Sequence, residues 1–144
     1  NLVIAGRDGG SETRLRNLAK ASGTSISFVG AVSESQKWAL LSKASVVLVP
    51  SLLEGFGITA VEAAFVGTPV LVSDSSALPE LAGCQEAIVP TRDPVKWATT
   101  VARLMSDEDF AKYVAEAQTS SLENFSRESV TKRLEDLYKA VVRR

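Results

Sequence analysis

Short apolar runs alternate along the chain with longer stretches in which apolar residues recur at helical spacing. The runs are rich in Val, Ile and Leu, and five of them are typical of strands. The five predicted strands cover residues 2–6, 26–32, 45–51, 68–74 and 87–90. The runs at 45–51 and 68–74 are continuously apolar, as parallel strands covered on both faces are. We therefore expect residues 45–51 to form a central strand with a parallel neighbour on each side.

Helical patterns fill the segments between and after these strands. The predicted helices cover residues 11–22, 33–44, 57–67, 94–105, 106 through the 110s and 126–144, with a short helix or turn at 76–83. Ser33 and Gln36 have the spacing of a capping box, Asp93 and Ser106 are predicted N-caps, and Gly67 is predicted to follow a helix end. The last helix has its apolar residues on one stripe, at Val130, Leu134, Leu137 and Val141.

This alternation of strand and helix indicates the fold class. It predicts a parallel sheet with right-handed crossovers and helices on both faces, a Rossmann-like three-layer α/β sandwich. The length of 144 residues fits one domain. Ligands of such sheets bind at the carboxyl ends of the strands, so the turn at 51–59 lies at the expected site.

Composition excludes several classes of function. The net charge is −1 and the basic residues are scattered, which argues against binding to nucleic acid. The chain has no histidine, which removes Ser-His and Cys-His catalysis. The single cysteine, Cys84, is predicted to be an inert thiol in a reducing compartment. No apolar run approaches the length of a membrane span.

The most informative stretch is SLLEGFGITAVEAAFVG, at residues 51–67, where an apolar run meets a helix. Glycines at 55 and 57 allow a ligand to approach the backbone closely. The start of the helix suits phosphate oxygens, because its N–H groups are unpaired and its dipole end is positive. A carboxylate there would repel phosphate, so Glu54 and Glu62 are better suited to neutral hydroxyl groups on either side. Hydroxyls flanking phosphates describe a nucleotide-diphosphate sugar.

Simpler interpretations exist for each of these residues. Thr59 and Glu62 have capping-box spacing, so Glu62 could serve only its own helix, although a start at Gly57 or Ile58 gives a longer helix. Glu54 could be a surface loop residue, and Phe56 could be a packing residue rather than a ligand contact.

The segment EGFGITAVE resembles the E-x7-E motif of the retaining glycosyltransferases of family four, which have the two-domain glycosyltransferase B fold. FVGAV, VVLVPS and GTPVLVSDSSALPEL are similar to the same family, and the resemblance covers nearly the whole chain. It implies one half of a glycosyltransferase B fold, the C-terminal domain that binds the nucleotide-sugar donor, over residues 1–144.

The resemblance also implies roles for individual residues. Glu54 would be the catalytic-site carboxylate that holds donor-sugar hydroxyls, and Glu62 would hold the ribose hydroxyls. Backbone from Gly55 to Thr59, thus including Phe56, Gly57 and Ile58, would meet sugar and diphosphate. Gly30 and Ala31 would lie against the nucleobase. Gly6 and Arg7, at the end of the first strand, could approach the phosphates, or Arg7 could be a solvated loop residue.

Departures from the family pattern shape the expected function. The chain begins at a strand with Asn1, so we expect a fragment that lacks the acceptor-binding N-terminal domain and the strand with the basic diphosphate clamp. The fragment alone is expected to be inactive, and the full-length enzyme to be a cytoplasmic glycosyltransferase, with membrane contact only through the other half. It would move sugar to a glycan (as in polysaccharide biosynthesis), a lipid or another acceptor.

The sequence leaves alternatives open for the donor and for the reaction. The sequences EGFGI and SSALPEL resemble bacterial mannosyltransferases, which favours GDP-mannose, with a UDP-sugar as the alternative. No cofactor or metal is expected. A sugar-nucleotide epimerase of related fold and a non-catalytic nucleotide-sugar-binding module are the rival functions.

Two further motifs are not expected to be sites. The segment 6–10, GRDGG, follows a strand and precedes a helix, but it lacks the spacing of a dinucleotide-binding loop. Asp107, Glu108 and Asp109 have the D-x-D pattern of metal sites in another glycosyltransferase fold. At a helix start, however, acidic residues simply suit the helix dipole.

Overall fold

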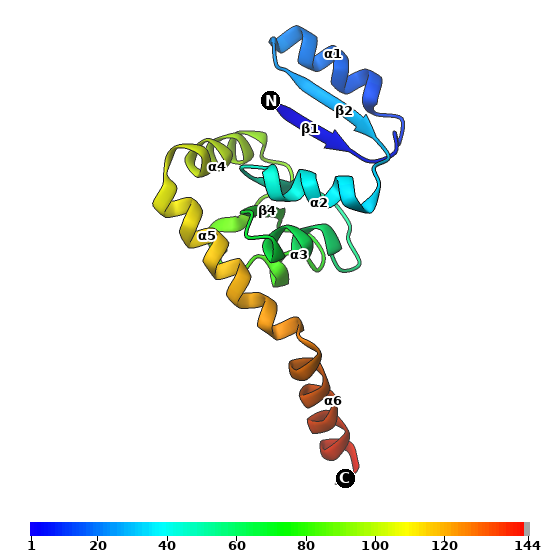
Figure 1. Ribbon diagram of the computed structural model, residues 1–144, viewed down its shortest axis with the longest axis vertical. Helices are drawn as coiled ribbons and strands as arrows, with labels where there is room; N and C mark the ends of the chain where they lie inside the picture. Colours follow the sequence, from blue (N-terminus) through cyan, green and yellow to red (C-terminus); the bar gives the residue numbers. More distant parts are fainter. Residues whose placement is uncertain (143–144) are drawn as a thin grey trace. The chain divides into compact units, whose positions relative to one another are not determined.

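The computed structural model describes residues 1–142, which form two compact units, Asn1–Ala39 and the chain from Leu40 onward (Figure 1). Both units combine helices with β-strands, and every strand pair in the described residues is parallel. The predicted α/β fold class is therefore confirmed. Within residues 1–142, five strands and six α-helices lie at the predicted places in the chain, with the strands shorter than predicted.

The smaller unit contains two parallel strands, the helix that connects them and the first residues of the helix that follows. Strand β1 (Leu2–Ala5) pairs with β2 (Ile26–Gly30), and α1 (Glu12–Ser22) lies between them in the sequence. The pairing shifts between Ile4 and Ala5, after which Ala5 lies opposite Gly30. The carboxyl ends of β1 and β2 therefore lie side by side at one edge of the sheet.

Helix α2 (Glu34–Lys43) begins with the predicted capping box. The backbone N–H of Ser33 donates to Oε1 of Gln36 at 2.8 Å, and the backbone N–H of Gln36 donates to Oγ of Ser33 at 3.3 Å. These reciprocal bonds satisfy two donors that a helix start otherwise leaves unpaired.

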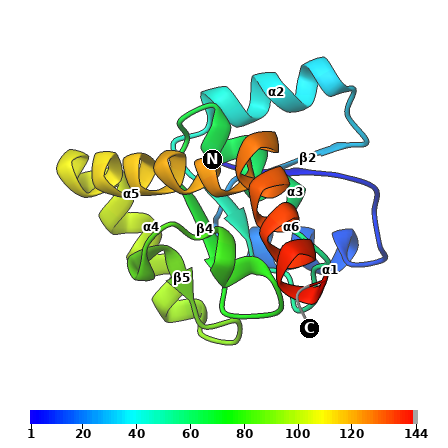
Figure 2. The same ribbon diagram turned by 90° about the horizontal axis from the view of Figure 1, so that it is seen from below.

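A three-stranded parallel sheet forms the centre of the larger unit. Its strands are β3 (Val47–Val49), β4 (Val70–Ser73) and β5 (Ile88–Val89), in the order β3-β4-β5. Helix α3 (Ile58–Phe65) packs against β3 and β4, and α5 (Glu108–Ser121) packs against β4. Figure 2 shows β4 and β5 with α4 and α5 beside them. Short 3-10 turns, η1 (Leu78–Leu81) and η2 (Gln85–Ala87), complete the core.

The predicted central position of residues 45–51 is wrong for the described pairings. Strand β3 pairs only with β4 and is an edge strand, whereas β4 is central. All four residues of β4 are buried, but Val47 and Leu48 of β3 are only half-buried. Both runs are continuously apolar, so hydrophobic pattern alone does not tell which one is central. A site after β3 is therefore supported by the loop that follows this strand and not by a central position of the strand.

Two helices follow the sheet and pack against each other. Helix α4 (Pro94–Ser106) has the predicted N-cap, because Asp93 accepts a hydrogen bond of 2.8 Å from the backbone N–H of Lys96. The sequence predicted Ser106 as the N-cap of α5, and this prediction is wrong. Ser106 is the last residue of α4, where its hydroxyl donates to the carbonyl of Ala102 at 2.9 Å, and Asp107 caps α5 instead.

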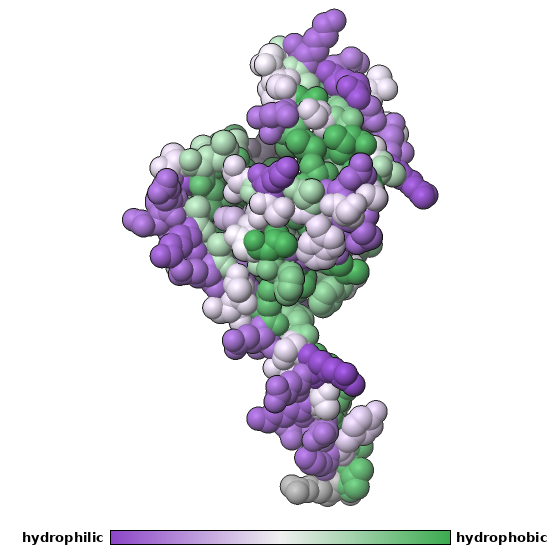
Figure 3. Space-filling model, viewed as in Figure 1, coloured by the Kyte–Doolittle hydropathy of each residue, from purple (hydrophilic) through white to green (hydrophobic). Residues whose placement is uncertain are grey.

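Helix α6 (Arg127–Val142) follows the 3-10 turn η3 (Leu122–Phe125) and has no buried residue. Its predicted apolar stripe remains exposed, from 39% for Val130 to 62% for Val141. Figure 3 shows hydrophilic side chains over most of the visible face of this helix. Arg143 and Arg144, the predicted end of the helix, lie outside the described residues. Within residues 1–142, no helix combines the length and apolar character needed to cross a membrane.

Candidate functional site

The loop between β3 and α3 holds Glu54 in a defined position. The hydroxyl of Ser51 donates a hydrogen bond of 3.1 Å to Oε1 of Glu54. The hydroxyl of Ser73, at the carboxyl end of β4, donates to the backbone carbonyl of Ser51 at 2.6 Å. Ser73 is fully buried, while Ser51 and Glu54 are half-buried. A buried strand end is thus connected through Ser51 to a partly solvent-accessible carboxylate.

Helix α3 begins at Ile58, with Gly57 as its N-cap. The interpretation of Thr59 and Glu62 as a capping box is therefore wrong, because Thr59 lies inside the helix. Glu62 is half-buried and lies one turn beyond Ile58. The first turn of α3 contains no acidic residue. Its first N–H groups have no partner within the helix, so this end of α3 suits an anion.

The two glycines of the motif have different surroundings. A Cβ added at Gly57 would lie 2.7 Å from Cδ2 of Leu78 and 2.9 Å from Cδ1 of Leu81, and Gly57 has a φ of 92°. Packing and backbone conformation therefore require glycine there, a reason that the sequence argument missed. Nothing lies within 4 Å of a Cβ added at Gly55. Of the two, only Gly55 leaves open space beside the loop.

Phe56 is a packing residue. Its ring meets that of Phe125 in η3 edge to face, with 5.6 Å between the centroids, and 44% of the residue remains exposed. This contact holds the ring of Phe56 against η3. The expected contribution of the Phe56 backbone to ligand binding stays a prediction.

In the smaller unit, three predicted site residues line one open hollow. Gly6, Arg7 and Gly30 lie around it at the carboxyl ends of β1 and β2, together with Asp8 and Glu12. The backbone N–H of Gly6 donates to the carbonyl of Gly30 at 2.8 Å. Ala31, the fourth predicted residue of this unit, does not belong to that lining. The roles of these residues toward a nucleobase or phosphate remain predictions of the resemblance.

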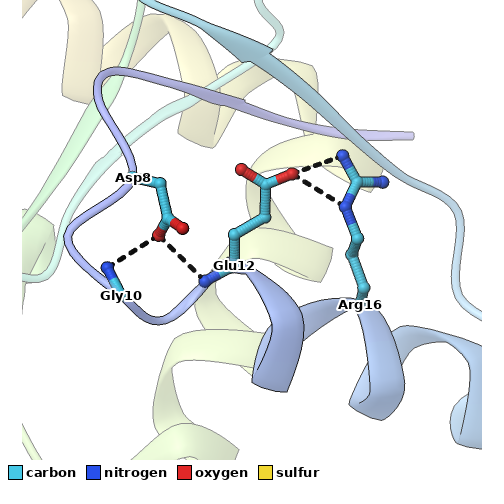
Figure 4. A network of polar contacts seen from close by, with 4 residues as sticks. All are labelled: Asp8, Gly10, Glu12 and Arg16. Carbon is cyan, nitrogen blue, oxygen red and sulfur yellow. Dashed lines mark hydrogen bonds and ion pairs between the residues drawn. The ribbon is translucent and has the colours of Figure 1, made fainter.

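The start of α1 is already occupied by a carboxylate (Figure 4). Oδ1 of Asp8 accepts hydrogen bonds from the backbone N–H of Gly10 at 2.8 Å and of Glu12 at 3.1 Å. The side chain of Glu12 pairs with Arg16 at 2.5 Å. Because a negative group fills the place that a pyrophosphate would take, this loop is unsuited to dinucleotides, in agreement with its spacing.

A second polar group lies at the carboxyl ends of β4 and β5, and sequence reasoning missed it. Oδ1 of Asp74 accepts hydrogen bonds from the hydroxyl of Thr91 and, at 2.9 Å, from its backbone N–H. These bonds hold the pKa of Asp74 below its ordinary value. The hydroxyls of Ser75 and Thr91 lie 2.7 Å apart. The available signal was that polar residues follow both apolar runs, Asp74 and Ser75 after the run of β4 and Thr91 after that of β5.

The remaining candidates have structural explanations. Burial raises the pKa of the Cys84 thiol, which lowers its reactive thiolate fraction and fits the expected inert role. Asp107 accepts a hydrogen bond of 2.9 Å from the backbone N–H of Phe110, so it caps α5. Glu108 and Asp109 occupy the first turn of the same helix, where negative charge is favourable.

Comparison with known proteins gives a consistent family. Residues 1–121 match the family described as glycosyl transferases group 1. A D-inositol 3-phosphate glycosyltransferase of Corynebacterium efficiens is 32% identical over 143 residues, which cover 95% of this chain and 34% of the relative. An MMP alpha-(1->4)-mannosyltransferase of Mycolicibacterium hassiacum is 32% identical over 118 residues, which cover 78% of this chain and 28% of the relative. This chain spans about a third of the length of these relatives.

Solved structures give the same fold. The structure of Anabaena Alr3699/HepE in complex with UDP-glucose matches with a TM-score of 0.77 at 18% identity, over 96% of this chain and 40% of that chain. At this level of identity the likeness concerns the fold alone.

Proposed function

This chain belongs to the glycosyl transferases group 1 family, and we propose that it binds the nucleotide-diphosphate sugar from which a retaining glycosyltransferase transfers the sugar. The relatives are longer than this chain, which spans 34% of the Corynebacterium efficiens enzyme. The proposal for transfer therefore includes a further domain that presents the acceptor, as the family resemblance implies. Binding of the donor is the part that the described residues themselves support.

The arrangement of Glu54 ahead of α3 carries this proposal. The Ser51 hydroxyl fixes one oxygen of Glu54, and α3 starts four residues later with no acidic residue in its first turn. A carboxylate suited to hydroxyl groups therefore precedes a helix start suited to phosphate. Glu62 adds a second carboxylate one turn into the same helix.

Each part has a role in the proposed complex. Glu54 accepts hydrogen bonds from hydroxyl groups of the donor sugar. The backbone N–H groups at the start of α3, around Ile58 and Thr59, bind the diphosphate. Glu62 accepts hydrogen bonds from the ribose hydroxyls. The helix dipole stabilises the negative charge that develops on the diphosphate as the sugar leaves, and preorganised charge of this kind is often the largest catalytic contribution.

The comparisons support two donor classes. The Mycolicibacterium hassiacum relative is a mannosyltransferase, which favours the GDP-mannose that the sequence resemblance suggests. The structural neighbour Alr3699/HepE binds UDP-glucose, which supports a UDP-sugar. We propose that the donor is a sugar nucleotide with either guanine or uracil as its base.

A thermal-shift panel tests the proposal. The chain is heated in EDTA with UDP-glucose, UDP-N-acetylglucosamine, GDP-mannose, ADP-glucose or NAD⁺, because the proposal includes no metal. We expect a concentration-dependent rise in Tm with one of the UDP- or GDP-sugars, since a ligand that binds only the folded state stabilises it. NAD⁺ is expected to have no effect. A response to NAD⁺ alone, or to no sugar nucleotide at millimolar concentration, would contradict the proposal.

A further inference from the structure

The position of Glu54 depends on two serines that lie outside the glutamate motif. Ser73 ends the central strand β4, is 0% exposed, and donates to the carbonyl of Ser51 at 2.6 Å. Ser51 in turn donates its hydroxyl to Oε1 of Glu54 at 3.1 Å. The two bonds form a continuous connection from the buried sheet to the carboxylate.

This connection matters because the surrounding loop offers Glu54 little other restraint. Its neighbours Leu52, Leu53 and Gly55 are exposed, with Leu53 84% exposed, and nothing lies within 4 Å of a Cβ at Gly55. Glutamate has a flexible side chain, and fixing it on ligand binding costs conformational free energy. A hydrogen bond that already holds one carboxylate oxygen removes part of that cost.

The bond also leaves the carboxylate able to bind. An ionised carboxylate has two oxygens with about four acceptor sites, and Ser51 occupies one of them. Oε2 and the second site on Oε1 remain suited to vicinal hydroxyl groups of a sugar.

We propose that Ser51, held by Ser73, is a positioning residue that orients Glu54 toward the donor sugar. The inference rests on the proposed function, because it assumes that Glu54 binds sugar hydroxyls. Its consequence is selective: Ser51 affects the sugar-dependent part of donor binding and not the binding of the nucleotide portion. A purely structural serine would affect both parts or neither.

Isothermal titration with matched ligands measures the sugar-dependent part. The affinity of the 144-residue chain for UDP-glucose is divided by that for UDP, and the affinity for GDP-mannose by that for GDP. We expect Ser51→Ala to reduce the ratio for the preferred donor about three- to tenfold, with the affinity for the bare nucleotide unchanged. Ser51→Thr, which keeps the hydroxyl, should restore the ratio. Ser75→Ala, which removes another hydrogen-bonded hydroxyl after β4, should leave the ratio unchanged.

A double-mutant cycle with Glu54→Ala separates positioning from stability. If Ser51 acts through Glu54, Ser51→Ala changes the ratio in the native chain and changes nothing further in the Glu54→Ala background. Melting curves identify a variant that does not fold, and in that case Ser51→Gly, which also removes the hydroxyl, replaces Ser51→Ala in the cycle.

The outcomes distinguish the two claims. If Ser51→Ala leaves the affinity ratio unchanged, whether it weakens the binding of nucleotide and sugar nucleotide equally or weakens neither, the positioning role is overturned. Donor binding by the native chain then still stands. Absence of binding of either ligand pair to the native chain would overturn the proposed function and the positioning role with it.

Discussion

Gly57 lies against Leu78: a Cβ at Gly57 would lie 2.7 Å from Cδ2 of the leucine, which is fully buried. The helix that follows Glu54 therefore starts directly on the core of the larger unit. The glycine has a positive φ of 92°, which strains any side chain, and a Cβ would force the side chains of Leu78 and Leu81 to shift. The start of α3, the proposed phosphate-binding end, is fixed by packing against η1.

Replacing this glycine should destabilise the fold. Gly57→Ala combines a left-handed backbone, which costs about 1–2 kcal/mol, with overpacking, which costs about 1–3 kcal/mol. We expect the urea midpoint of unfolding to fall accordingly. Gly55→Ala is the matched control, because its Cβ meets nothing within 4 Å, and it should unfold like the native chain. Equal midpoints for all three would show that Gly57 is not constrained.

The buried side chain of Gln118 should contribute as much to stability as Gly57. Oε1 of Gln118 accepts from the backbone N–H of Val70 at 3.0 Å, and its Nε2 donates to the Val70 carbonyl at 2.7 Å. Strand β5 begins opposite Val72, so Gln118 pairs with the part of β4 that β5 does not reach. Gln118→Leu leaves both backbone groups unsatisfied, at about 1–3 kcal/mol each.

Chemical denaturation checks this prediction. Gln118→Leu should lower the free energy of unfolding by at least about 2 kcal/mol, whereas Gln85→Leu, on an exposed glutamine, should change it little. Similar losses for the two variants would mean that the double hydrogen bond contributes nothing specific.

Asp74 should give stability a defined dependence on pH. Hydrogen bonds from the side chain and backbone of Thr91 lower the pKa of Asp74 from its usual 3.8. A lowered folded-state pKa means that the carboxylate adds stability above pH 3.8 and that this stability is lost as the pH falls through the folded-state value. Asp74→Asn should therefore melt below the native chain at pH 7, by a small margin since the site is exposed. The gap should close in acid, and a gap that widens there would refute this assignment.

Much of the local structure could be predicted from the sequence because its causes lie within a few residues. The capping box of Ser33 and Gln36, the N-cap at Asp93 and the helix end before Gly67 all depend on adjacent backbone groups. The placement of Glu54 in a loop at a strand end was predictable for the same reason. The choice between Ser106 and Asp107 as N-cap was not, because both residue types cap helices and only the length of α4 decides.

Long-range relationships were beyond the sequence pattern. The order of the strands depends on pairing, and continuously apolar runs at β3 and β4 look alike although only β4 is central. The contacts of Gln118 with Val70 and of Ser73 with Ser51 join residues far apart in the chain. A polar residue within an apolar pattern does not indicate which distant residue it bonds to, so these hydrogen bonds could not be predicted from the sequence.

If the segment from Glu54 to Glu62 binds a nucleotide-diphosphate sugar, its backbone amides should respond to that ligand in a ¹H–¹⁵N NMR titration. The native chain and Glu62→Gln are titrated with the sugar nucleotide that raises Tm most, with Glu116→Gln, an exposed glutamate of α5, as control. We expect the amides of Phe56–Thr59 to shift with ligand concentration. Glu62→Gln should weaken binding by about 1–2 kcal/mol, or roughly five- to thirtyfold. Shifts confined to residues outside this segment, or equal affinities for the native chain and Glu62→Gln, would contradict the account.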